Sequence, residues 1–178
     1  MKTRKTRKLV LASLLAAVGV AILAMGSFLR GTVLMASFLI LFCLLEMGYR
    51  YAFSLYAVIA VLSLILLPHL KGTWMFLIFQ GHFPIVKFGF EKLFGKVFSW
   101  IPKFLLFNAV FAILVFFLGG FFGISLRMEN PAGWSPRIIY MIYFIVWDCV
   151  CVVFDVLCGK LAKIYVSKYK PRFSKHLK

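Results

Sequence analysis

The sequence predicts an all-α membrane protein, a bundle of six transmembrane helices with an amphipathic interfacial helix between helices 4 and 5. Apolar residues make up 63% of the 178 positions, and the mean hydropathy is +0.99. A soluble domain of this length leaves much of its surface in water, whereas helix faces that meet lipid can be apolar. The apolar residues also form long runs, with the basic residues between the runs and at both ends. These observations predict one integral membrane domain over residues 1–178.

The first predicted span, residues 9–29, has 21 uncharged positions and follows a segment with five basic residues and no acidic one. As a helix it is about 31 Å long, which is enough to cross the hydrocarbon core. A cleaved signal peptide has a shorter apolar core, of roughly 7–15 residues, so we expect a retained anchor. Small residues recur at four-residue spacing, which lets another helix approach closely. They form two rows, Ala12 with Ala16, and Ser13 with Ala17 and Ala21.

Five further apolar runs complete the predicted bundle: 33–48, 51–67, 72–86, 104–126 and 138–159. Only 72–86 is doubtful as a span, because it has 15 residues and is interrupted by Gly81 and Pro84. The charges decide the matter. With six spans and a cytoplasmic N-terminus, 17 of the 21 basic residues lie inside, whereas five spans would place the seven-charge tail outside. The positive-inside rule therefore favours six spans in a bacterial cytoplasmic membrane, with both termini cytoplasmic.

Residues 87–103 are predicted to form the interfacial helix. Six apolar residues share one helical face: Phe90, Leu93, Phe94, Val97, Phe98 and Ile101. The opposite face is polar, with Lys87, Glu91, Lys92, Lys96 and Ser99. A helix of this kind lies in the membrane surface, with its aromatic side toward the acyl chains and its lysines toward the headgroups.

The net charge of +16 reflects membrane topology rather than nucleic-acid binding, because the basic residues flank apolar runs and form no soluble basic face. The tail 160–178 has seven basic residues and no acidic one, which predicts contact with the anionic inner leaflet. Docking of a protein partner is the alternative for this tail. The four cysteines all lie in apolar runs, which favours buried thiols over disulfides or a metal site. No catalytic motif or cofactor motif is present, so we expect no enzyme.

Polar residues inside the spans are the candidates for function, because they are costly in lipid. They are Gln80, His82, Asn108, Asp148 and Asp155, with Glu46 as a further candidate. One hypothesis is a cluster from helices 4, 5 and 6 that binds a ligand, a proton or a partner. The break at residues 81–84 favours it, because interrupted helices often mark binding sites in transporters. The alternative is structural hydrogen bonding between helices, with Asp155 paired to Lys87 or Arg50.

The loop 127–137 is the longest predicted outer loop. Its polar and aromatic residues are Arg127, Glu129, Asn130, Trp134 and Arg137. Such a loop is suited to covering a ligand. A tryptophan beside proline and arginine is also typical of a simple interface anchor, and both interpretations stay open.

The six spans, the basic N-terminus running into KLVLASLLAAVGVAI, and the Ala12-xxx-Ala16 pair resemble the substrate-binding S subunits of energy-coupling-factor (ECF) transporters. The resemblance implies that Ala12 and Ala16 dock on a transmembrane coupling subunit with associated ATPases, and that a small substrate is captured for uptake. The rival hypothesis is a non-catalytic membrane subunit or scaffold. It would hold protein partners or anionic lipid through the interfacial helix and the basic tail.

Overall fold

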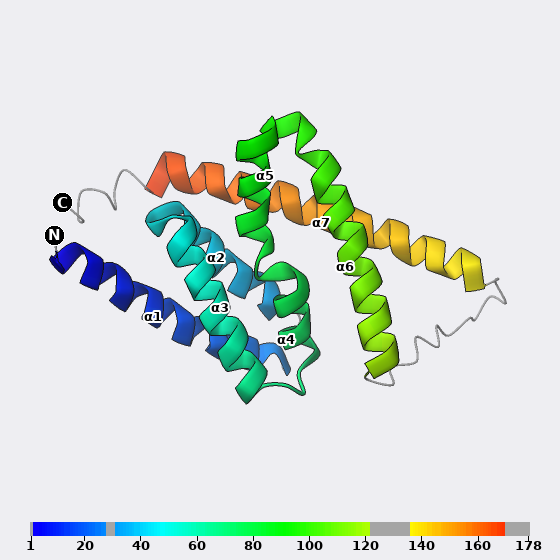
Figure 1. Cartoon of the computed structure of the whole chain (residues 1–178), viewed down its shortest axis with the longest axis horizontal. Coiled ribbons are helices and arrows are strands. Elements are labelled where there is room, and N and C mark those ends of the chain that lie inside the picture. The colour runs from blue at the N-terminus through cyan, green and yellow to red at the C-terminus, as the bar shows by residue number, and fades with distance from the viewer. Residues whose placement is uncertain (1, 28–30, 122–135, 170–178) are drawn as a thin grey trace. The chain divides into compact units, whose positions relative to one another are not determined.

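The computed structural model describes residues 2–27, 31–121 and 136–169, and every element in these ranges is a helix (Figure 1). The all-α prediction is therefore confirmed. These described ranges contain seven α-helices: α1 (Lys2–Ala24), α2 (Thr32–Met47), α3 (Tyr49–Leu66), α4 (Lys71–Met75), α5 (Phe83–Phe98), α6 (Trp100–Phe121) and α7 (Pro136–Ile164). A 3₁₀ turn, η1 (Met25–Ser27), follows α1, and two π-helical turns, η2 (Phe76–Gln80) and η3 (Tyr165–Tyr169), follow α4 and α7.

Three described segments are long and apolar enough to cross a membrane: Thr6–Ala24, Tyr49–Leu66 and Met141–Lys168. Two shorter helical segments, Thr32–Met47 and Trp100–Ile113, are also apolar. A span of the hydrocarbon core needs about 17–25 apolar residues in a helix. These helices are therefore compatible with a membrane protein.

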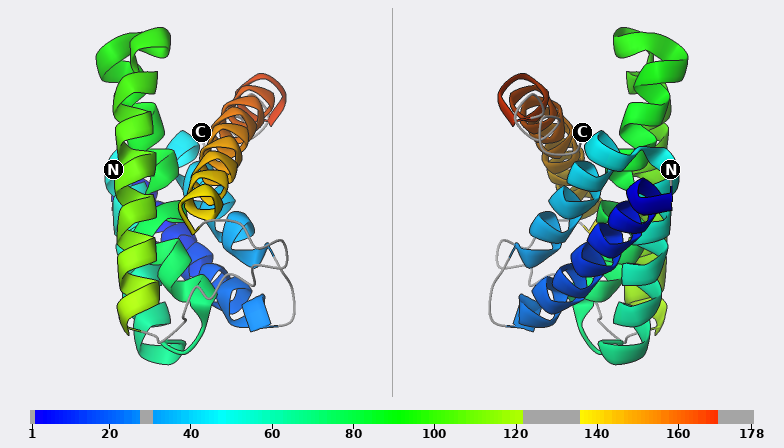
Figure 2. Two further views of the ribbon diagram at one scale, coloured as in Figure 1. Left: turned by 90° about the vertical axis from the view of Figure 1, so that its right-hand side faces the viewer. Right: turned by 90° about the vertical axis from the view of Figure 1, so that its left-hand side faces the viewer.

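The chain divides into two compact units. Unit 1 comprises Met1–Gly89 and Cys158–Lys178, and unit 2 comprises Phe90–Leu157. In unit 1, α1, α2 and α3 lie side by side (Figures 1 and 2). Their facing sides bury an apolar core that α4 and η2 extend, with Ala36, Ile40, Leu55, Ile59 and Phe76 fully buried.

Gly48 makes the sharp turn between α2 and α3. Its φ of 93° is a conformation that residues with a Cβ rarely adopt. Its N–H donates to the carbonyl of Leu44 at 3.1 Å and so completes the last turn of α2. The one-residue turn brings α3 back against α2, which explains how two predicted spans with almost no loop between them can pack together.

The row of small residues on α1 faces the core of unit 1. Ala16 is buried in that core, and Ala12 packs against it. At Gly19 a methyl group would come within 2.5 Å of Cδ1 of Ile59, so α1 and α3 approach closely at this point. Ala16 is thus covered by the chain's own helices, whereas Ala12 is only partly buried, and docking of another subunit at these two residues stays a prediction. The second row, Ser13, Ala17 and Ala21, is exposed.

Substituting Gly19→Val is expected to destabilise the protein by about 1–3 kcal/mol, because a branched side chain has no room against Ile59. Ala17→Val is the matched control, since Ala17 lies on the same helix with its side chain exposed. We expect that control to stay within about 0.5 kcal/mol of the parent protein. Thermal unfolding in detergent measures both. Equal melting temperatures for the two variants would contradict the close approach of α1 and α3.

The predicted continuous helix 87–103 is wrong. Gly95 adopts φ 73° and ψ 176° inside α5, and Ser99 separates α5 from α6. Glycine tolerates this left-handed φ, and the chain bends here instead of continuing as a straight amphipathic helix. One lysine of the predicted polar face also differs from expectation, since Lys87 is buried rather than directed to headgroups, and Lys103 at the end of the segment is buried as well.

The last helix continues beyond residue 159, where the predicted span ends. Helix α7 continues to Ile164, and η3 carries the helical path to Tyr169. Residues 160–169 of the expected tail are thus an extension of the last helix. Residues 170–178 lie outside the described part of the chain.

Candidate functional site

The fourth predicted span is an interrupted helix, and the interruption follows from two residues. Pro84 has no N–H, so it cannot donate to the carbonyl of Gln80 in the usual α-helical bond. The N–H of Gly81 reaches back five residues to the carbonyl of Phe76, at 2.8 Å, in a π-type bond. The carbonyls of Leu77 and Gln80 therefore lose their normal partners within the helix, and they need donors from elsewhere.

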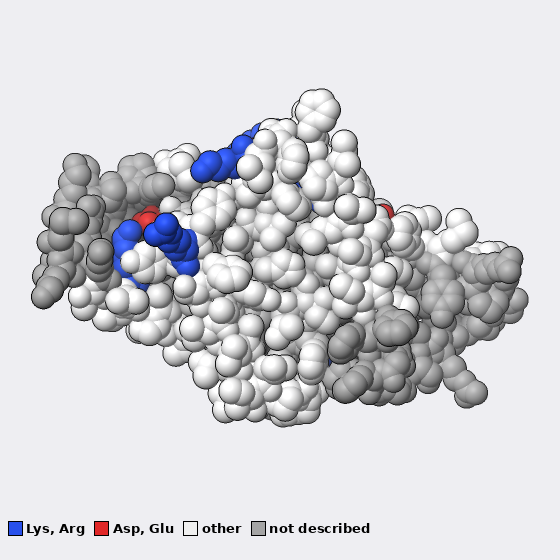
Figure 3. Space-filling view, in the orientation of Figure 1, with Lys and Arg blue, Asp and Glu red and all other residues white. Residues whose placement is uncertain are grey.

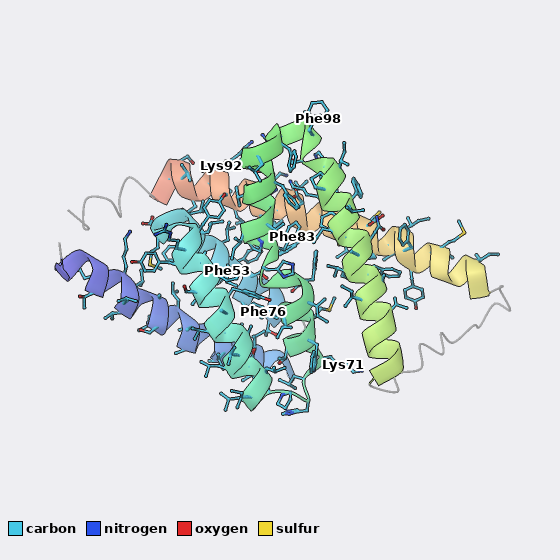
Figure 4. The ribbon with its side chains drawn as sticks, in the orientation of Figure 1. Phe53, Lys71, Phe76, Phe83, Lys92 and Phe98 are labelled. Atoms are coloured by element: carbon cyan, nitrogen blue, oxygen red, sulfur yellow. The ribbon has the colours of Figure 1, made fainter. Side chains whose placement is uncertain are left out.

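Two side chains from neighbouring helices supply these donors. The hydroxyl of Tyr56 on α3 donates to the carbonyl of Leu77 at 2.8 Å, and the hydroxyl of Ser37 on α2 donates to the carbonyl of Gln80 at 2.5 Å. Phe76 and Phe83, both buried, flank the break (Figure 4). The break is therefore held open by specific hydrogen bonds within unit 1.

Thr73, Gln80 and His82 complete what we call the helix-break cluster, together with Ser37 and Tyr56. The ring of His82 lies edge-on to the ring of Tyr56, with centroids 5.9 Å apart, and His82 also hydrogen-bonds the backbone of Leu77. Gly81 has no space for a side chain, because a methyl group there would lie 2.7 Å from the Tyr56 ring. The absence of a side chain at Gly81 thus leaves room for Tyr56, whose hydroxyl donates to the carbonyl of Leu77.

Two polar atoms of the helix-break cluster are buried and have no hydrogen-bond partner among the described residues. They are Oγ1 of Thr73 and Oε1 of Gln80. Thr73 lies in α4, and Gln80 is the last residue of the π-helical turn that follows it. A buried polar atom without a partner costs about 1–3 kcal/mol, so such atoms call for an explanation, and a bound group with hydrogen-bond donors would satisfy an atom of this kind.

Unit 2 contains a buried ionic cluster. Nζ of Lys103 on α6 lies 2.8 Å from Oε1 of Glu91 on α5 and 2.9 Å from Oδ1 of Asp155 on α7. The side chain of Lys103 is only 1% exposed, and its ammonium group also lies 5.2 Å from the centre of the Trp100 ring. Lys103 was not among the partners that the sequence predicted for Asp155. The cluster links α5, α6 and α7, and the ion pair with Lys103 compensates the buried charge of Asp155.

Two further polar residues lie in unit 2, Asn108 on α6 and Asp148 on α7. The amide Nδ2 of Asn108 donates to the carbonyl of Phe104, one turn earlier, at 2.8 Å. Oδ1 of Asn108 and Oδ1 of Asp148 are buried without a hydrogen-bond partner in the described ranges. Nearby, Nε1 of Trp147 donates to the carbonyl of Phe107 at 3.0 Å and links α6 to α7.

The five predicted polar residues are therefore divided between the units. Gln80 and His82 belong to the helix-break cluster of unit 1, whereas Asn108, Asp148 and Asp155 belong to unit 2. Glu46 lies in unit 1, where the hydroxyl of Tyr165 donates to its Oε1 at 2.6 Å.

The predicted outer loop falls largely outside the described residues, and this includes Arg127, Glu129, Asn130 and Trp134. Arg137 lies in the first turn of α7, but its side chain is outside the described part. Of the cysteines, Cys43, Cys151 and Cys158 are buried as expected, and Cys149 is exposed. Within the described ranges, no three His, Cys, Asp or Glu residues come together in a group that could hold a metal ion.

Ser37 and Tyr56 were not predicted from the sequence as site residues, because hydroxyl side chains are common in apolar helices. A signal for them does exist. A proline in a helix leaves the carbonyl four residues earlier without its usual N–H donor, so Pro84 predicts that a side chain of a neighbouring helix donates to the carbonyl of Gln80.

Comparisons with protein-family models, with curated protein sequences and with solved structures return no match.

Proposed function

We propose that the protein is a non-catalytic, multi-pass membrane protein that binds a small polar ligand at the helix-break cluster. The carrying observation is the pair of buried, unpartnered oxygens of Thr73 and Gln80 beside an interrupted helix. A ligand with hydrogen-bond donors, such as hydroxyl or amino groups, complements these oxygens. Discontinuous helices supply the substrate sites of many transporters, which supports this choice over purely structural packing.

The proposed setting is the bacterial cytoplasmic membrane, with six spans and both termini in the cytoplasm. The apolar helices and the distribution of basic residues support this topology. The proposed role is that of a substrate-binding subunit in an energised uptake complex, as in the ECF resemblance. Since Ala16 is buried within unit 1, a coupling subunit would have to reach another face of the protein.

Ligand binding is tested with Gln80→Leu and Thr73→Val, which remove the unpartnered oxygens at nearly constant volume. We expect each variant to fold at least as well as the parent, because a buried polar atom without a partner is lost. We also expect each to reduce ligand affinity by roughly ten-fold, the value of one good hydrogen bond. Native mass spectrometry of gently extracted protein measures the bound mass directly.

Ser54→Ala is the matched control for both variants. Ser54 is exposed, and its hydroxyl donates to the carbonyl of Arg50 in its own helix at 3.0 Å, so its removal should leave the bound mass unchanged. If Gln80→Leu and Thr73→Val retained the parent's ligand occupancy, the helix-break cluster would not be the binding site.

Purification of the tagged protein tests the proposed role in uptake. An uptake subunit is expected to bring a coupling subunit and ATPase subunits with it after mild solubilisation. Recovery without any ATPase and without any bound small molecule would contradict uptake and would favour a scaffold.

A further inference from the structure

The bend between α5 and α6 exposes a continuous group of large apolar side chains. Leu93 is 76% exposed, Val97 77%, Phe98 70% and Ile101 71%. Residues 91–103, which we call the corner segment, contain all four, and Figure 4 shows Phe98 at the tip of the bend. Exposed apolar side chains also occur on other helices, Leu105 at 74% and Ile65 at 69% among them, and side chains of this kind are suited to contact with lipid.

Two lysines accompany these apolar side chains at the surface. Lys92 and Lys96 are both exposed, and in Figure 3 basic side chains lie among uncharged ones where Figure 4 labels Lys92. The only acidic residue of the corner segment is Glu91, whose carboxylate lies 2.8 Å from Nζ of Lys103. The exposed charge of the corner segment is thus positive, and it is complementary to an anionic surface.

The base of the corner segment is held rigidly while its tip is exposed. Lys103 is locked between Glu91 and Asp155, which fixes the start of α6 against α5 and α7 within unit 2. At the bend, the hydroxyl of Ser99 donates to the carbonyl of Lys96 at 3.1 Å, and Ser99 is buried. The exposed side chains therefore project from a preformed bend, so little conformational entropy is lost when they bind.

We propose that the corner segment is an anchor for anionic lipid, with Leu93, Val97 and Phe98 entering the acyl region and Lys92 and Lys96 binding headgroup phosphates. Large apolar side chains interleaved with lysines are the composition of interfacial lipid anchors. Lys103 takes no part, because its charge is already used in the ionic cluster. This proposal stands independently of ligand binding at the helix-break cluster.

A fluorescent label at the tip tests the proposal in the full chain. Phe98→Cys, in a Cys149→Ser background, carries bimane, and the protein is reconstituted into equal mixtures of phosphatidylcholine and phosphatidylglycerol. Bromine on one lipid or the other then quenches the label according to which lipid surrounds it. We expect strong quenching overall, with brominated phosphatidylglycerol quenching more than its phosphatidylcholine counterpart.

Lysine variants test the headgroup contacts. A lysine near an anionic surface contributes a factor of about five in binding, so Lys92→Gln with Lys96→Gln should lower the preference for phosphatidylglycerol by about 25-fold. Lys71→Gln, another exposed lysine, is the matched control and should leave the preference unchanged. A label at Val58→Cys on α3 reports ordinary lipid contact and should show no preference between the two lipids.

Three results would overturn the proposal. A label at position 98 that neither lipid quenches would place the corner segment away from the bilayer, as docking to a protein would do. Equal quenching by the two lipids would remove the anionic preference. If the preference for phosphatidylglycerol survived the double lysine substitution, residues other than Lys92 and Lys96 would be responsible for it. Because Lys92 and Lys96 are exposed, their variants should keep the parent's melting temperature, and this is checked in the same samples.

Discussion

Replacing Lys103 with methionine is expected to lower the free energy of unfolding by about 3–5 kcal/mol, the largest effect predicted for any single substitution in this chain. The side chain of Lys103 is 1% exposed and lies within 2.9 Å of two carboxylates, Glu91 and Asp155. Methionine fills a similar volume but leaves those carboxylates without the ammonium group between them. Removing one partner from a buried ion pair costs more than the lost packing of a side chain of similar volume. Thermal unfolding in detergent measures the effect.

Two further variants separate charge from shape at Lys103. The triple substitution Lys103→Met, Glu91→Gln and Asp155→Asn removes the carboxylates as well, and it should recover a large part of the lost stability, since buried ion pairs can often be replaced by neutral groups. Lys96→Met makes the same chemical change at an exposed position and should have little effect. If Lys103→Met unfolded at the same temperature as the parent, the ionic cluster would not contribute to stability.

The positions of the helices could be predicted from the sequence because apolar runs and charges report them directly. Runs 33–48 and 51–67 correspond to α2 and α3 within two residues at each end. The location of the break near Gly81 and Pro84 was also predicted correctly, because glycine and proline disturb helices through their own covalent structure.

The direction in which individual side chains point could not be predicted in the same way. Periodicity placed Lys87 with the surface lysines, yet Lys87 is buried, and so is Lys103. Burial of Lys103 depends on Glu91 and Asp155, and the latter is 52 positions away in the sequence, so no local pattern reports it. Ala16 similarly belongs to a row of small residues that suits contact with another subunit, but it is buried in the chain's own core, to which α1, α2 and α3 all contribute.

Gly81→Ala is expected to destabilise the protein by about 1–3 kcal/mol, and it tests how the break is built. A methyl group at this position would lie 2.8 Å from the carbonyl oxygen of Phe76 and 2.7 Å from the Tyr56 ring, so backbone or ring must move. Gly89→Ala is the matched control, because nothing lies within 4 Å of a methyl group there. In a helix that change is neutral or stabilising by up to about 1 kcal/mol. Opposite signs for the two glycines are therefore expected from thermal unfolding.

A double-mutant cycle shows whether the Gly81→Ala effect passes through Tyr56. If the new methyl group displaces the ring, the hydrogen bond from Tyr56 to the carbonyl of Leu77 is already broken in Gly81→Ala. Tyr56→Phe should then add little further loss, so the two effects would be less than additive. Strict additivity would mean that the ring keeps its place and that the Phe76 carbonyl alone absorbs the clash. The cycle thus determines whether Gly81 serves the approach of Tyr56 or only the π-helical turn.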